Sequence, residues 1–273
     1  MSARTTTSRG TFAGDTWVIA RRGLLHMRRQ PEALSDATIQ PVMFVLLFAF
    51  VFGGAIGVPG GGDYKEFLMG GIFAQTIVFG AFGVAMALAQ DRNNGAIDRF
   101  HSLPISRATL LSGHAVASLI RALLPIVFMS IAGFVVGWRI HTGMLDILAG
   151  YGLMLAFSFA IIWIGVLMAS FVKTPEAVQG VAFIAIFPIT FIASTFVPTS
   201  TLPSVLRTFA EWNPTSSLAN ALRHLFGNPG GHAAPDAVWP LAHPVAYTLI
   251  WAAGIVVVCA PLAVMQYQRS IRS

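Results

Sequence analysis

The chain has 273 residues, of which 55% are apolar and only 10% charged. A soluble globular domain carries about 25% charged residues, so this composition argues against a water-soluble enzyme. Residues with formal charge are missing from six stretches: 37–62, 67–90, 122–138, 147–172, 177–206 and 237–268. Crossing the hydrocarbon core of a bilayer takes about 20 mostly apolar residues. We therefore expect an all-α integral membrane protein.

The net charge of +6 and the isoelectric point near 10.2 have to be interpreted from where the basic residues lie. If the N-terminus is cytoplasmic, twelve Lys and Arg residues fall on the cytoplasmic side of the predicted spans. Only Lys65, Arg139, Arg207 and Arg223 fall on the other side. This distribution follows the positive-inside rule. It predicts a multi-pass protein with both termini in the cytoplasm, and it gives no reason to expect a nucleic-acid partner.

Residues 1–36 are predicted to form a cytoplasmic tail that contains a helix over 12–30. Arg21, Arg22, Arg28 and Arg29 fall on one side of that helix, which is moderately amphipathic. Such a helix is expected to lie in the cytoplasmic membrane interface, where anionic lipid headgroups attract it. The alternative is a solvated helix that serves topology only.

Residues 37–266 are predicted to form the transmembrane domain, and 267–273 a second cytoplasmic tail. Gly53 and Gly57 are expected near the end of the first span, at a spacing that lets helices approach closely. Pro125 predicts a kink in the third span. The expected spans are about 38–57, 67–90, 108–137, 147–172, 177–197 and 244–266.

The external loop before the last span contains two short amphipathic stretches, about 202–211 and 215–226. Phe209 and Trp212 suit an aromatic belt at the membrane interface.

Several chemistries are missing from the sequence. A Walker A loop needs a Gly-Lys pair, but Lys65 follows Tyr64 and Lys173 follows Val172. No His-Glu-x-x-His or Gly-x-Ser-x-Gly motif occurs, which disfavours an intramembrane hydrolase. Cys259 is the only cysteine, and the spacing of the external histidines matches no ligand motif. We expect no enzyme activity, metal or cofactor on this chain.

The segment between the second and third predicted spans carries a family resemblance. Its Asp91-Arg92, Gly95, Ile97-Asp98-Arg99 and Leu103-Pro104-Ile105-Ser106-Arg107 resemble the cytoplasmic motif of type-2 ATP-binding-cassette exporter permeases. Ala96 stands where that family usually has Thr, and Asp91 and Asp98 where it has Glu. Trp212-Asn213-Pro214 in the external loop is also similar to the family. The resemblance covers most of the chain and extends to the permeases of daunorubicin-resistance exporters of actinobacteria.

This resemblance implies that residues 91–104 dock on a separate ATPase subunit, which would bind ATP and magnesium. It also implies a second permease copy or a sibling permease, a bacterial plasma membrane location, and re-entrant helices before the last span. The alternative for the loop is a solvated connection whose arginines only fix topology. The residues expected to couple to the ATPase are Asp91, Arg92, Gly95, Asp98, Arg99, Phe100, Leu103 and Pro104.

Phenylalanines recur every four residues in the first and fifth spans and so line one face of each. Aromatic faces hold apolar cargo without fixed geometry; the alternative is contact with lipid or helix packing. The predicted pathway residues are Phe44, Phe48, Phe52, Thr76, Phe187, Phe191 and Ser194.

Arg121 is an intramembrane charge of the third span. We expect it to snorkel to the cytoplasmic surface or to find a buried polar partner, with Gln75, Gln90 and Gln179 as candidates. A direct contact with substrate is the alternative.

These features together predict the permease subunit of an ATP-driven exporter of lipophilic or amphipathic molecules, embedded among membrane lipids. Drugs, antibiotics of the polyketide class, glycolipids and long-chain lipids all suit such a pathway, and the direction of transport rests on the resemblance. The alternative is a six-helix channel or membrane scaffold that uses no ATP.

Overall fold

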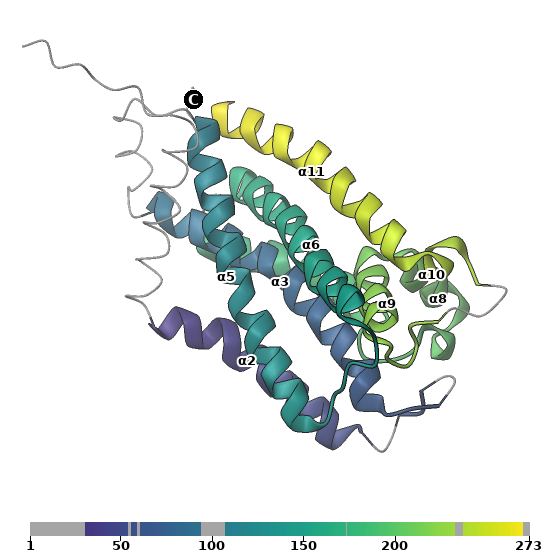
Figure 1. Ribbon diagram of the computed structural model, residues 1–273. Coiled ribbons are helices and arrows are strands. Elements are labelled where there is room, and N and C mark those ends of the chain that lie inside the picture. Colours follow the sequence, from purple (N-terminus) through teal and green to yellow (C-terminus); the bar gives the residue numbers. More distant parts are fainter. Residues whose placement is uncertain are drawn as a thin grey trace, which may run out of the picture.

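The computed structural model describes residues 31–53, 56–58, 61–93, 107–172, 174–232 and 237–269 (Figure 1). This part of the chain is helical and contains no strand. The predicted interfacial helix over 12–30 lies outside the described residues. The helices are α2 (Pro31–Val51), α3 (Tyr64–Asn93), α5 (Arg107–Val136), α6 (Met144–Phe171), α7 (Pro175–Phe191), α8 (Ser204–Trp212), α9 (Pro214–Phe226), α10 (Trp239–Ala242) and α11 (Pro244–Arg269).

Four of the described helices are long and apolar enough to cross a membrane, over Tyr64–Asp91, Ser118–Val136, Met144–Phe171 and Pro244–Gln266. Two shorter apolar helices, Ile39–Val51 and Pro175–Phe191, occupy the places of the first and fifth predicted spans. The chain is therefore an all-helical, multi-pass membrane protein. That all six of these helices cross the bilayer stays a prediction.

The boundaries of α2 differ from those predicted for the first span. α2 begins at Pro31, runs through Pro41 and ends at Val51, so Gly53 and Gly57 lie past its end and not inside it. Glycine is a poor helix former, and the sequence from Gly53 to Gly62 is rich in glycine. The expected close packing of α2 through these two glycines is therefore wrong.

α3 and α6 form the centre of the bundle, and they pack against each other along their length. Gly165 of α6 lies so close to α3 that an added Cβ would overlap the Ala81 carbonyl and come within 2.9 Å of the Val84 Cβ. α9 packs against α3, α6 and α11. α8, α9 and α10 gather at one end of the bundle (Figure 1), called here the α9 end.

α3 connects the α9 end to the opposite end of the bundle. Its first residue, Tyr64, packs in the core at the α9 end, and its 30 residues span roughly 45 Å at about 1.5 Å per residue. The segment predicted to couple to an ATPase therefore begins at the end of α3 farthest from α9.

We predict that Gly165→Ala destabilises the protein and that Gly152→Ala does not. Overpacking a tight helix contact costs about 1–3 kcal/mol, whereas a Cβ at Gly152, in the same helix, meets nothing within 4 Å. The midpoint of thermal unfolding in detergent is the measurement. Equal midpoints for the two variants would contradict the close α3–α6 contact.

Candidate functional site

α9 presents polar side chains along one face. Asn213 caps the helix, since its side chain accepts a hydrogen bond from the Thr215 backbone N–H at 2.8 Å, and Pro214 occupies the first turn. Ser216, Asn220 and Arg223 follow at i, i+4 and i+7 and so share a face. This face points into the protein, where Arg223 is 0% exposed.

The Arg223 guanidinium donates hydrogen bonds to three parts of the chain. Nε donates to the Phe67 carbonyl at 2.8 Å. Nη1 donates to Ser194 Oγ at 3.0 Å and to Asn220 Oδ1 at 2.8 Å. Nη2 donates to the carbonyls of Ser194 at 2.7 Å and Thr195 at 3.4 Å. These residues, called here the Arg223 cluster, join α3, α9 and the linker that follows α7.

All the acceptors of Arg223 are neutral oxygens, so its charge is balanced by dipoles rather than by a carboxylate. The Phe67 ring adds to this balance, since its centroid lies 3.6 Å from the guanidinium carbon. Burial lowers the pKa of Arg223, while the hydrogen bonds that its guanidinium donates favour the charged form. A buried charge is tolerated only when its hydrogen bonds are made, which ties these elements together.

The linker between α7 and α8, residues 192–203, is held by further contacts. The Tyr64 hydroxyl donates to the Phe196 carbonyl at 2.9 Å, and Ser216 Oγ accepts from the Ser194 backbone N–H at 2.8 Å. Gly71 of α3 leaves room for this linker, because an added Cβ would overlap the Thr195 carbonyl. α7 ends at Phe191 rather than near 197 because the Ser194 N–H donates to Ser216 Oγ instead of continuing the helix.

The predicted phenylalanine rows are present, one along α2 and on to Phe52 just past its end, the other in α7. Ring centroids of Phe44 and Phe48 are 5.9 Å apart, and those of Phe48 and Phe52 are 5.1 Å apart. In α7, Phe187 lies 5.3 Å from Phe183 and 4.6 Å from Phe191.

Phe196 of the linker joins the two rows. Its ring stacks on Phe48 at 4.3 Å and lies 5.5 Å from Phe191. Phe196 is only 7% exposed, whereas Phe52, Phe187 and Phe191 are 37–40% exposed. The resulting aromatic surface consists of Phe44, Phe48, Phe52, Phe183, Phe187, Phe191 and Phe196.

The other two predicted pathway residues lie elsewhere. Thr76 is partly buried and donates to Met129 Sδ at 3.3 Å, between α3 and α5. Ser194 is 3% exposed and belongs to the Arg223 cluster. The structure thus brings five of the seven pathway residues together, and their role in transport stays a prediction.

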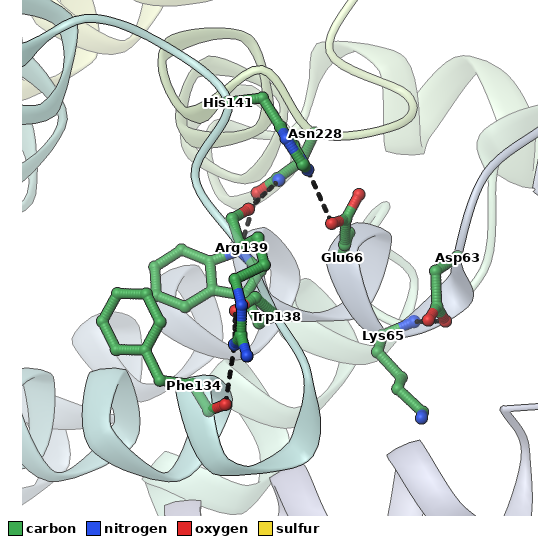
Figure 2. A network of polar contacts seen from close by, with 8 residues as sticks. All are labelled: Asp63, Lys65, Glu66, Phe134, Trp138, Arg139, His141 and Asn228. Atoms are coloured by element: carbon green, nitrogen blue, oxygen red, sulfur yellow. Dashed lines mark hydrogen bonds and ion pairs between the residues drawn. The ribbon is translucent and has the colours of Figure 1, made fainter.

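A second network fixes the loop between α5 and α6 at the same end (Figure 2). Trp138 Nε1 donates to Asn228 Oδ1 at 2.8 Å, and Asn228 Nδ2 donates to the Arg139 carbonyl at 2.8 Å. His141 Nε2 lies 2.7 Å from Glu66 Oε1, so this loop also contacts the start of α3. The Trp138 ring packs among aromatic side chains of α3, α5 and α9.

At the opposite end, Asp91 and Arg92 belong to the last turn of α3. The other predicted coupling residues, Gly95, Asp98, Arg99, Phe100, Leu103 and Pro104, lie outside the described residues.

Arg121 of α5 is partly buried, and its Nε has no hydrogen-bond partner in the described part of the chain. None of the three glutamines considered as partners bonds to it there. The buried polar partner expected for Arg121 is therefore not found among the described residues.

Sequence reasoning missed Arg223 and Phe196 as organising residues. Arg223 was counted only as an external charge, although its spacing from Ser216 and Asn220 marks a polar helix face. That pattern does not distinguish a face toward water from a face toward buried carbonyls. No group of three or more His, Cys, Asp or Glu that could hold a metal occurs within the described ranges.

We predict that Asn228→Ala destabilises the α9 end by about 1–3 kcal/mol, because the buried Trp138 N–H loses its acceptor. In a Trp138→Phe background no indole N–H needs an acceptor, so Asn228→Ala is expected to cost less there than in the unaltered protein. Thermal unfolding of the purified protein in detergent measures the cost in each background. An equal cost in the two backgrounds would contradict the assigned hydrogen bond.

Comparison with known proteins identifies the family of the chain. Residues 14–226 match the family described as ABC-2 type transporter. The chain is 27% identical to the daunorubicin resistance ABC transporter permease protein DrrB1 of Streptomyces coeruleorubidus, covering 98% of this chain and 91% of that protein. It is 26% identical to the probable doxorubicin resistance ABC transporter permease protein DrrC of Mycobacterium tuberculosis, over 95% and 90% of the two chains.

A relative with a less specific name is the putative transport permease ycf38 of Porphyra purpurea, 25% identical over 77% of this chain and 73% of that protein. The family match covers most of the chain, including the predicted coupling loop, the aromatic surface and the Arg223 cluster. The chain belongs to the ABC-2 type transporter family.

Proposed function

We propose that this chain is the membrane permease subunit of an ATP-driven exporter, and that its cargo is a lipophilic or amphipathic drug. The observation that carries this proposal is the match to drug-resistance permeases over nearly the whole chain. The aromatic surface supports it, since stacked rings bind flat apolar molecules without requiring one hydrogen-bonding pattern. Antibiotics and lipids of similar polarity fit the same surface.

The energy for transport comes from ATP hydrolysed with magnesium on a separate ATPase subunit. Residues 91–104 connect that subunit to α3, which runs to the Arg223 cluster at the α9 end. α3 also packs against α5, so a displacement of the coupling loop reaches α5 as well. An ATP-independent channel or scaffold is the alternative, and it would need no such docking loop.

A second permease, identical or related, completes the transport unit. Within the described part of the chain, α7 buries one row of residues, Val178, Ala182, Ile186 and Thr190, and most of its remaining apolar side chains are exposed. Its 17 residues measure roughly 25 Å, close to the hydrocarbon thickness of about 30 Å. Packing against another permease would cover this face better than lipid alone.

The membrane is the bacterial plasma membrane, with six crossings and both termini in the cytoplasm. α8 and α9 are then re-entrant helices at the external side, where Phe209 and Trp212 of α8 are exposed and suit the interface.

We predict that Asp98→Arg abolishes recovery of the ATPase subunit with the purified permease in mild detergent, because a reversed charge in the docking loop repels its partner. Asp146→Arg is the matched control, since it makes the same charge change at an exposed position in the first turn of α6. The measurement is the stoichiometry of a Walker-motif protein in the preparation. Equal recovery with both variants would remove the docking role of Asp98.

A second prediction concerns the cargo. Phe191→Ala should raise the doxorubicin concentration that half-maximally stimulates the ATPase of the reconstituted complex by roughly two- to tenfold, since an aromatic contact contributes about 0.5–1.5 kcal/mol. Phe128→Ala in α5 is the control, because Phe128 is similarly exposed but lies outside the aromatic surface. If doxorubicin and other apolar drugs never stimulate the unaltered complex, the proposed cargo class is wrong.

A further inference from the structure

We infer that Arg223 is a positioning residue of the export pathway: it holds the linker so that Phe196 joins the phenylalanine rows of α2 and α7 into one surface. The claim that this surface binds cargo rests on the proposed function. The claim that Arg223 sets the place of Phe196 does not.

Arg223 holds the linker through three hydrogen bonds. Arg223 donates to the carbonyls of Ser194 and Thr195 and to the Ser194 hydroxyl. These acceptors directly precede Phe196. A guanidinium makes such contacts in a fixed planar fork, which a lysine ammonium cannot reproduce.

Arg223 is itself anchored on α3. Its Nε bonds to the Phe67 carbonyl of α3, and its cation lies over the Phe67 ring. Tyr64, one turn earlier in α3, bonds to the Phe196 carbonyl. The linker is therefore fixed relative to α3, the central helix, rather than only to α9.

In this position Phe196 contacts both phenylalanine rows. Its ring stacks on Phe48 and contacts Phe191, whereas contacts between α2 and α7 are too few to join the two rows directly. A shift of the linker would separate the rows and leave two shorter aromatic strips. A large flat cargo would then contact one strip at a time.

The positioning claim is tested without any cargo. In a Cys259→Ala background, Phe48→Cys and Phe196→Cys are combined, and the yield of a short thiol-reactive crosslinker is measured on the full chain in detergent. We expect Arg223→Lys to lower the yield to less than about half because the fork is lost. Arg207→Lys, the same substitution at an exposed arginine outside the Arg223 cluster, should leave the yield unchanged.

A second variant moves the linker without altering Arg223. Gly71→Ala places a Cβ against the Thr195 carbonyl and should lower the crosslinking yield, while Gly80→Ala, in the same helix with nothing within 4 Å of its Cβ, should not. If Arg223→Lys does not fold, the two glycine variants decide whether the position of the linker sets the crosslinking yield. Unchanged crosslinking in folded Arg223→Lys or in Gly71→Ala overturns the inference.

The functional consequence is tested in the complex with its ATPase. Arg223→Lys and Phe196→Ala should each raise the half-stimulating doxorubicin concentration by about threefold or more, with the maximal stimulated rate retained. The double variant should resemble Phe196→Ala alone, because Arg223 acts through that ring. Additive effects would overturn the inference. Absence of doxorubicin stimulation in the unaltered complex contradicts the proposed function instead, and the crosslinking result still decides the positioning.

Discussion

A fully buried arginine with neutral acceptors constrains the whole α9 end of this protein. In a medium of low polarity, each N–H of a guanidinium that loses its acceptor leaves part of a charge unsolvated. Arg223 therefore holds together the residues that satisfy it, and these come from α3, α9 and the linker after α7. Replacing the acceptors by a single carboxylate would neutralise the charge but would tie Arg223 to one element only. Distributed carbonyls tie it to all three.

The same geometry gives the aromatic surface its continuity. Phenylalanines spaced by four residues line up on any helix, so each row follows directly from local structure. The rows are separate until Phe196 lies between them, and Phe196 itself lies outside any helix. Its place comes from Tyr64 and Arg223, which bind the carbonyls of the linker. Stacked rings contact cargo mainly through dispersion and burial, and this agrees with drugs as the cargo class.

The opposite end of α3 shows a different arrangement. Arg121 of α5 has a buried Nε without a hydrogen-bond partner among the described residues. Asp91, in the last turn of α3, begins the loop proposed to contact the ATPase. Within the described part of the chain, α3 therefore connects that loop to the Arg223 cluster. Such an arrangement suits a helix that transmits movement from an outside source of energy.

The sequence by itself determined the helical membrane class, the approximate places of the apolar helices and the family. Every span has to cross the same hydrocarbon layer, so apolar runs without charge alternate with polar segments that lie outside it. The sequence also located α8 and α9 near Pro203 and Pro214, because proline begins helices locally. Only the tertiary structure decided that α7 stops at Phe191, that Ser194 is buried, and that the polar face of α9 points inward. These outcomes depend on which distant carbonyls reach Arg223, and no spacing within a single helix contains that information.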